Sequence, residues 1–258
     1  MATFLFDEII FGPIKSRRLG NSLGINLLPE DVKYCTYDCI YCECGWTYSE
    51  KFKNIKMHSA LEVKVALENK LKTLLTDGNY PDNITFAGNG EPTAHPEFSQ
   101  IIEDTILLKN TYFPKAKISV LSNATQLHKE KIRLALEKTD HTILKLDAAD
   151  NELFQLINRP QKNFSLEKLI ENLKAFSGRL IIQTMFLRGE IEGKNFDNTT
   201  PDQLQKWIEL LQQIKPYKIM IYSIDRDTPA QKLIKCSAEE LNNIVILLKN
   251  SGFDVASY

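Results

Sequence analysis

The strongest constraint on the fold is a regular alternation of short apolar runs with longer amphipathic stretches. The apolar runs are rich in β-formers and occupy residues 22–28, 83–88, 117–122, 142–147, 180–186 and 218–223. Segments with helical periodicity occupy residues 59–76, 97–109, 125–138, 150–176, 201–214 and 238–251. Nearly continuous apolar strands are typical of parallel sheets that helices cover on both faces.

The predicted strand–helix units indicate an α/β protein with an open or partial (β/α) barrel, since each connection is long enough for a right-handed crossover. A six-stranded doubly wound sheet is the alternative, because periodicity does not fix strand order. Ser59, Asp202 and Ser237 lie at or near predicted helix starts. No linker divides the chain, so we expect one domain over 1–258, with 1–21 as an N-terminal extension and 22–258 as the core.

Composition narrows the protein class. The chain has 258 residues, is 43% hydrophobic and 25% charged, and can bury a large core without disulfides. Its net charge of −1 gives no overall basic field that would indicate nucleic-acid binding. The N-terminal residues include acidic side chains and no basic region, and no apolar run reaches the roughly 20 residues of a membrane helix. We expect a cytoplasmic protein with no membrane partner and with reduced thiols.

The segment "KYCTYDCIYCECG", residues 33–45, holds four of the five cysteines, at Cys35, Cys39, Cys42 and Cys44. The first three have the spacing C-x3-C-x2-C, which favours an iron–sulfur cluster with one iron left open. Zinc usually takes paired knuckles on two separate hairpins. A zinc-binding scaffold that uses all four thiols remains the alternative from a non-enzyme class. Cys236 is interpreted as a packing residue, and Cys44 as a neighbour that is not a ligand.

Polar or glycine-containing segments follow the predicted strands: "GNGEPT", "SNAT", "DAAD", "FLRGE" and "SIDRDTP". In α/β barrels the carboxyl ends of the strands build the active site, so these segments predict one large site. Ser, Asn and Asp also cap helices, which is the alternative explanation for "SNAT" and "DAAD".

The segment "CTYDCIYC" resembles the signature of the radical S-adenosylmethionine (radical SAM) superfamily, with Tyr41 directly before the last cysteine. "GNGEPT" looks like the family's Gly-Gly-Glu motif, with Asn89 at the first glycine and with Gly90 and Glu91 in place. "FGPIKSRRLGNSLGINLLPE", "YCECGWT", "INRP" and "YSIDRDTPA" resemble a subgroup of small iron–sulfur oxidoreductases related to wyosine-forming tRNA enzymes.

The resemblance implies a partial (β/α)6 TIM-like barrel and two cofactors. Cys35, Cys39 and Cys42 would hold a [4Fe-4S] cluster, and the open iron would bind the methionine part of S-adenosylmethionine. One electron from a flavodoxin- or ferredoxin-like donor would cleave that molecule to a 5′-deoxyadenosyl radical, which abstracts hydrogen from an unidentified substrate. The protein would supply orientation and exclude water.

The resemblance also assigns cofactor contacts. Glu91 would accept a bond from the methionine ammonium, unless it only favours the next helix start, and Gly90 would permit close backbone approach. Ser122 and Asn123 would bind ribose hydroxyls or the carboxylate, and Tyr41 would line the adenine pocket or exclude solvent. Of Gln183 and Met185, we expect only one to face the barrel interior and favour Gln183.

Substrate contacts are expected from charged residues that the cofactor chemistry does not require. Arg17 and Arg18 suit the capture of a carboxylate or phosphate, and Lys145 and Asp147 either form an internal ion pair or contact substrate. Lys51, Lys53 and Lys56 could extend a positive rim. An anionic substrate, an RNA base and a protein or peptide are the alternatives that the sequence leaves open.

Overall fold

The protein is described here by a computed structural model that covers residues 4–48, 50, 52, 55–160 and 163–258. Its main feature is an eight-stranded sheet with the order β1-β2-β3-β4-β5-β6-β9-β11. β1 pairs with β2 in antiparallel fashion, and every later pair is parallel. Strands that follow one another in the chain are therefore neighbours in the sheet. The doubly wound alternative is wrong, because its strand order would reverse direction, and the curled sheet is a half-barrel.

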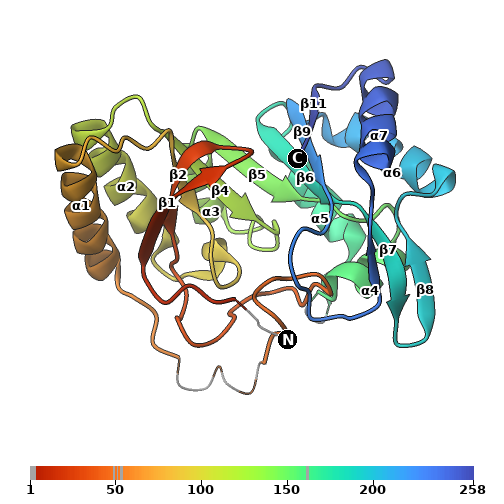
Figure 1. Cartoon of the computed structure of the whole chain (residues 1–258), viewed down its shortest axis with the longest axis horizontal. Helices are drawn as coiled ribbons and strands as arrows, with labels where there is room; N and C mark the ends of the chain where they lie inside the picture. Colours follow the sequence, from red (N-terminus) through yellow and green to blue (C-terminus); the bar gives the residue numbers. More distant parts are fainter. Residues whose placement is uncertain (1–3, 49, 51, 53–54, 161–162) are drawn as a thin grey trace.

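The strands of the main sheet are β1 (Ile10–Ser16), β2 (Gly20–Ile25), β3 (Asn83–Phe86), β4 (Lys117–Ser122), β5 (His141–Lys145), β6 (Leu180–Met185), β9 (Lys218–Tyr222) and β11 (Val255–Ser257). The helices are α1 (Ala60–Thr76), α2 (Phe98–Tyr112), α3 (Glu130–Leu136), α4 (Asn151–Asn158), α5 (Leu166–Lys174), α6 (Pro201–Ile214) and α7 (Ala238–Asn250), with a 3₁₀ turn, η2 (Pro92–Ala94). Figure 1 shows α1 and α2 at one end of the molecule and α6 and α7 at the other, with the curled sheet between them.

Local chemistry explains most helix boundaries. Ser59 and Ser237 each form a capping box, in which the serine side chain accepts from the amide three residues on and a glutamate returns the bond. The expected single helix at 150–176 is wrong, because α4 ends at Asn158 and the next residue, Arg159, adopts a left-handed conformation with φ of 46°. Ser165 then begins α5 by accepting a bond from the Lys168 amide. The break leaves the C-terminal end of α4 free to contact the cysteine loop.

The two faces of the sheet have different chemistry because side chains alternate along each strand. Outward-facing residues such as Val120, Leu144 and Ile182 pack into the main core. On the inner face, Ile143, Ile181 and Met220 form a smaller apolar cluster. The residues two positions further along β5 and β6 are Lys145 and Gln183, which pair in register. The inner face is therefore apolar in the middle of the strands and becomes polar toward their carboxyl ends.

The structure contains strands that the sequence patterns did not indicate. β1 lies inside residues 1–21, the expected extension, and forms a hairpin with β2. A small second sheet has the order β10-β7-β8, from β7 (Leu187–Ile191), β8 (Lys194–Asp197) and β10 (Leu233–Lys235). These strands are short or polar, so they give no apolar run. Among the described residues, no helix is both long and apolar enough to cross a membrane.

Candidate functional site: a cysteine-lined cavity

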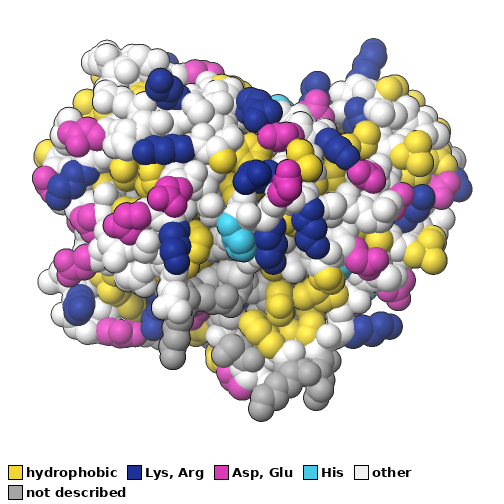
Figure 2. Space-filling model, turned by 180° about the vertical axis from the view of Figure 1, so that it is seen from behind, with side chains coloured by type: hydrophobic (Ala, Val, Ile, Leu, Met, Phe, Trp, Pro, Cys, Tyr) yellow, Lys and Arg dark blue, Asp and Glu magenta, His cyan; other side chains and the backbone are white. Residues whose placement is uncertain are grey.

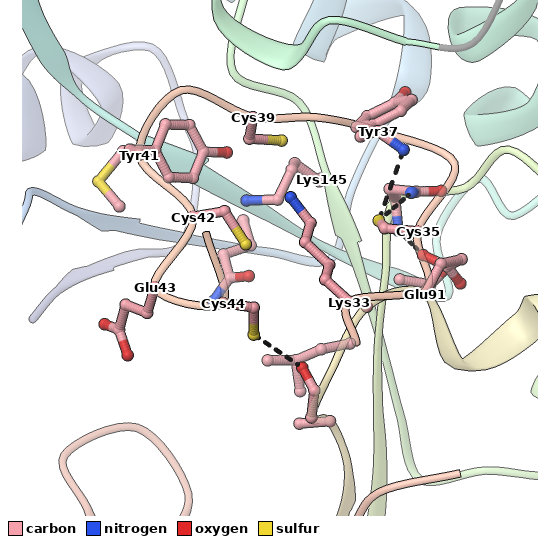
Figure 3. Close-up of a pocket in the computed structure, with 18 of the residues that line it drawn as sticks. Lys33, Cys35, Tyr37, Cys39, Tyr41, Cys42, Glu43, Cys44, Glu91 and Lys145 are labelled. Atoms are coloured by element: carbon pink, nitrogen blue, oxygen red, sulfur yellow. Dashed lines mark hydrogen bonds between the residues drawn. The ribbon is translucent and has the colours of Figure 1, made fainter. Parts of the chain in front are cut away.

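The cysteine loop borders a cavity of about 260 Å³. The side chains of Cys35, Cys39, Cys42 and Cys44 all line it. Figure 3 shows the first three sulfurs facing the same space, whereas the Cys44 sulfur points to a backbone oxygen. The Cys44 thiol donates to the Gly88 carbonyl oxygen at 3.4 Å. Three thiols on one loop thus face one cavity, and the fourth, which also lines it, is directed at a backbone carbonyl.

The C-terminal end of α4 holds the cysteine loop in place. The amide of Ile40 donates to the Ile157 carbonyl at 3.0 Å, and the amide of Asp38 donates to the Asn158 carbonyl at 3.1 Å. The Asn158 side-chain amide also donates to Cys39 Sγ at 3.5 Å. The segment "INRP" therefore has a structural role at the site, as a backbone and side-chain support for the middle of the loop.

The "GNG" segment at 88–90 supports the start of the same loop. A Cβ on Gly90, whose φ is 142°, would lie 1.9 Å from the Tyr34 carbonyl oxygen, so this contact requires glycine. Asn89 bonds both the amide and the carbonyl of Phe6, each at 2.8 Å, and the Pro29 carbonyl at 2.8 Å. Asn89, where this sequence departs from Gly-Gly-Glu, thus uses its side chain to join its own segment to the segments that contain Phe6 and Pro29.

The Glu91 carboxylate is buried, with 2% of the residue exposed, and is held by four donors. Oε1 accepts from the Thr93 amide at 3.0 Å, the Thr93 hydroxyl at 2.5 Å and the Ser122 hydroxyl at 2.8 Å. Oε2 accepts from the Asn123 amide at 2.6 Å. Burial raises the pKa of Glu91, and these hydrogen bonds oppose the rise. Glu91 also caps η2, so the expected alternative role as a cap is observed.

Asp147 is the centre of a second buried network. Its carboxylate accepts bonds from the Tyr41 hydroxyl, from Asn158 Nδ2 at 2.6 Å and from the Met185 amide at 2.9 Å. Lys145 Nζ lies 3.6 Å from the same carboxylate. The internal ion pair expected between Lys145 and Asp147 is therefore present. Asp147 ties Tyr41 of the cysteine loop to the ends of β5, β6 and α4.

Comparison with known proteins agrees with this arrangement. The family model described as "Radical SAM superfamily" matches residues 30–195, which include the cysteine loop and the strand ends that surround it. The chain belongs to the radical SAM superfamily. A "UPF0026 protein" of Methanocaldococcus jannaschii is 31% identical over 246 residues, which are 94% of this chain and 71% of that protein.

Solved structures of radical SAM enzymes share the fold. A radical SAM methyltransferase from Sphaerobacter thermophilus matches with a TM-score of 0.67 at 15% identity, over 92% of this chain and 65% of that one. Streptococcus suis SuiB, bound to S-adenosylmethionine, matches with a TM-score of 0.64 at 16% identity, over 91% of this chain and 50% of that one. The chain thus spans about two thirds of the length of the methyltransferase and half of the length of SuiB. At 15% and 16% identity, the likeness shows a shared fold.

The donor set fits the iron–sulfur cluster and S-adenosylmethionine that the radical SAM superfamily uses. Among the described residues, no three His, Cys, Asp or Glu side chains converge closely enough to hold a single metal ion. Thiolates are the usual ligands of iron–sulfur clusters, which present several irons to their ligands rather than one. Three thiols around one cavity, with two ammonium groups beside them, suit an anionic cluster of this kind.

The thiols of the radical SAM motif differ in their electrostatic surroundings. Burial raises the pKa of Cys35 to about 12 and that of Cys39 to about 11. The neighbouring Cys44 side chain lowers the pKa of Cys42, and the same contact raises the pKa of Cys44. For Lys33, burial acts to lower the pKa, but Cys42, Cys35 and Cys39 outweigh it and raise the pKa. Cys42 therefore differs from Cys35 and Cys39 in the direction of its pKa shift, and Lys33 stays an ammonium.

The structure gathers most of the residues that the sequence indicated. The residues that line the cavity and were expected at the site are Arg18, Cys35, Cys39, Tyr41, Cys42, Gly90, Glu91, Ser122, Asn123, Lys145 and Gln183. Met185 lines it as well, so the expectation that only Gln183 faces inward is wrong, because residues two apart on a strand share a face. Asp147 lies behind the cavity wall, with its side chain fully buried.

Arg17 and Arg18, the adjacent arginines of the β1–β2 turn, have different surroundings. Arg17 forms an exposed ion pair with Asp225 at 2.8 Å. The Arg18 guanidinium lies 4.7 Å from the centroid of the Tyr222 ring and, among the described side chains, has no carboxylate partner. A second cavity of about 170 Å³ adjoins the first, and four residues line both: Arg18, Glu43, Met185 and Tyr222.

Some residues at this site had no signal in the sequence. Lys33, Tyr37 and Tyr222 line the cavity but were not expected there. Lys33 stands two positions before the first cysteine, but nothing in the spacing indicates that its side chain turns inward. Lys51 and Lys53 of the expected positive rim lie outside the described residues, and Lys56 lies 3.9 Å from Glu62.

Proposed function

We propose that the protein is a radical SAM enzyme whose Cys35, Cys39 and Cys42 bind a [4Fe-4S] cluster. The observation that carries this proposal is that the three thiols border the same cavity as the buried carboxylate of Glu91. One electron passed through such a cluster to S-adenosylmethionine would release a 5′-deoxyadenosyl radical, which takes a hydrogen atom from the substrate. A flavodoxin- or ferredoxin-like protein would supply the electron.

Glu91 would bind the methionine ammonium of S-adenosylmethionine through Oε2. Each carboxylate oxygen can accept about two hydrogen bonds. Oε1 already has three donors, whereas the Asn123 amide is the one described donor to Oε2. An ammonium at Oε2 would make a charge-assisted bond and offset the burial that raises the pKa of Glu91. Capping of η2 and ammonium binding use different oxygens, so one side chain can do both.

Other strand-end residues would shape the rest of the cofactor pocket. The Tyr41 hydroxyl is fixed by Asp147, so its ring is held at the cavity wall and excludes water there. The Asn123 side chain is oriented by its 2.8 Å bond to Thr36 Oγ1. Gln183 and Ser122 add neutral polar groups that suit ribose hydroxyls or a carboxylate. These side chains orient a ligand without adding charge.

The substrate would be a small anion held at the junction of the two cavities. The cofactors would occupy much of the 260 Å³ cavity, which leaves the adjoining 170 Å³ cavity for substrate. Arg18 lines both and carries a positive charge that no described carboxylate neutralises. A guanidinium suits planar recognition of a carboxylate or phosphate. Lys145 is close by, but Asp147 already balances its charge.

An RNA substrate is less well supported by the surface. Arg226 pairs with Glu43 at 2.8 Å, and Arg17 pairs with Asp225. Two of the three arginines around the second cavity are therefore neutralised by a carboxylate. Figure 2 shows acidic and basic side chains intermingled over the face that it presents. Affinity for RNA depends on several unpaired cations that neutralise phosphates together. One unmatched arginine suits a single anionic group instead.

The test is production of 5′-deoxyadenosine by anaerobically reconstituted protein with dithionite and S-adenosylmethionine. Cys39→Ala should abolish the product, whereas Cys236→Ala should retain it. Both thiols are buried, so the pair controls for the loss of a packed sulfur. Wild-type protein that holds iron but makes no 5′-deoxyadenosine, alone or with pools of small anions, would refute the proposal.

A further inference from the structure

Lys33 is a buried cation at the cysteine loop. Its side chain is 2% exposed, and Nζ donates to the Gly45 carbonyl oxygen at 2.9 Å. Figure 3 shows the Lys33 and Lys145 side chains pointing into the space that the thiols border. The bond to Gly45, in the turn that follows Cys42, thus fixes the end of the Lys33 side chain.

The two ammonium groups are balanced differently. Lys145 lies beside Asp147, whose side chain is fully buried. Lys33 has Asp38 at 3.4 Å, but the Asp38 side chain is 26% exposed and also accepts from the Thr47 amide at 2.7 Å. A buried ammonium is costly unless a nearby anion compensates it. Among the described residues, the remaining negative charge near Lys33 would come from the cysteine thiolates.

We propose that Lys33 is a positioning residue that also sets the reduction potential of the iron–sulfur cluster. The proposal rests on the proposed function, since it requires that Cys35, Cys39 and Cys42 hold the cluster. Its bond to Gly45 fixes the turn after the last ligand. Its charge balances the cluster and the thiolates that would hold it.

The expected direction of the effect follows from charge. One electron taken up from the donor would add one negative charge to the cluster. A nearby cation stabilises the reduced state more than the oxidised state, so Lys33 raises the potential. Asp38 has the opposite charge on the same loop, so it lowers the potential. Removing each charge should therefore shift the potential in opposite directions.

The experiment is a potentiometric titration of the reconstituted holoenzyme, followed by the electron paramagnetic resonance signal of the reduced cluster. The variants are Lys33→Met, Lys33→Gln, Lys33→Arg and Asp38→Asn, with Lys64→Met on the surface of α1 as a control. In the two neutral Lys33 variants, the ratio of reduced to oxidised cluster at the wild-type midpoint should fall about tenfold or more. It should rise in Asp38→Asn and stay close to wild type in Lys33→Arg and Lys64→Met.

The sign pattern separates charge from distortion of the loop. Distortion gives no reason for Lys33→Gln and Asp38→Asn to shift the potential in opposite directions. Neutral Lys33 variants with the wild-type potential would overturn the proposal. Loss of iron from both neutral variants would also overturn it, because Lys33 would then serve assembly alone. Wild-type protein that bound no cluster would instead refute the proposed function.

Discussion

The side-chain amide of Asn158 donates a 2.6 Å hydrogen bond to Asp147 and so joins the end of α4 to the residue that follows Leu146, beyond β5. The same amide lies 3.5 Å from Cys39 Sγ. Tyr41 and the Met185 amide donate to the same carboxylate. One buried anion and its donors therefore fix the cysteine loop together with the backbone bonds to α4.

Asn158→Leu should destabilise the protein by about 1–3 kcal/mol, because it leaves a buried carboxylate without one of its donors. Urea unfolding of the apo protein measures the change. Asn242→Leu, on the exposed face of α7, is the matched control and should have little effect. Equal stability of Asn158→Leu and wild type would mean that the other donors satisfy Asp147 fully.

Replacing any one of Cys35, Cys39 and Cys42 by alanine should remove most of the iron, since three thiolates are the minimum set proposed for the cluster. Cys44→Ala and Cys236→Ala should keep iron close to the wild-type content. Iron and sulfide analysis after anaerobic reconstitution measures both. If Cys44→Ala lost the metal as completely as Cys42→Ala, a four-cysteine site would replace the proposed one.

Glu91→Gln should weaken S-adenosylmethionine binding about tenfold or more, because a charge-assisted hydrogen bond contributes roughly 1.5–3 kcal/mol. Iron content should not change. Thr93→Val is the control, because it removes a donor to Oε1 but leaves the charge in place. Calorimetry that finds equal affinity in Glu91→Gln and wild type would leave Glu91 with only its capping role.

In the apo protein, iodoacetamide should alkylate Cys42 before Cys35 or Cys39. The neighbouring Cys44 side chain lowers the pKa of Cys42, whereas burial raises the pKa values of the other two thiols. The thiolate is the form that reacts, so Cys42 should react below pH 9, where the other two remain protonated. Cys44→Ala should move the Cys42 pH profile upward, as mass mapping of the labelled peptides would detect. An unchanged profile would contradict the role of Cys44.

Arg18→Ala should reduce turnover of the true substrate while sparing substrate-free cleavage of S-adenosylmethionine. Arg18 lines both cavities and lacks a described carboxylate partner. Arg17→Ala is the control at the adjacent position, because Asp225 already neutralises Arg17. The measurement is KM and kcat with each candidate anion. Equal losses in the two variants would show that the whole hairpin turn matters and not the guanidinium of Arg18.

The sequence by itself determined the strands that carry the site and the loop that carries the thiols. Buried parallel strands need continuous apolar runs, so the six predicted strands recur as β2, β3, β4, β5, β6 and β9 with small shifts at their ends. The cysteine spacing and the residues at the strand ends are local patterns, and the order of strands in the sheet brings them to one cavity.

Only the tertiary structure decided which side chains meet across long stretches of chain. Lys33 turns inward because its ammonium reaches the Gly45 carbonyl, and Asn158 reaches Cys39 because α4 ends at Asn158. Arg17 and Arg18 are adjacent in the sequence and differ only in their partners, because Arg17 pairs with Asp225 and Arg18 lies over the Tyr222 ring. Both partners lie about 200 positions later in the chain. Such contacts depend on how the sheet curves and on where each helix ends. Neither leaves a periodic signal in the sequence, because both follow from packing of the whole chain.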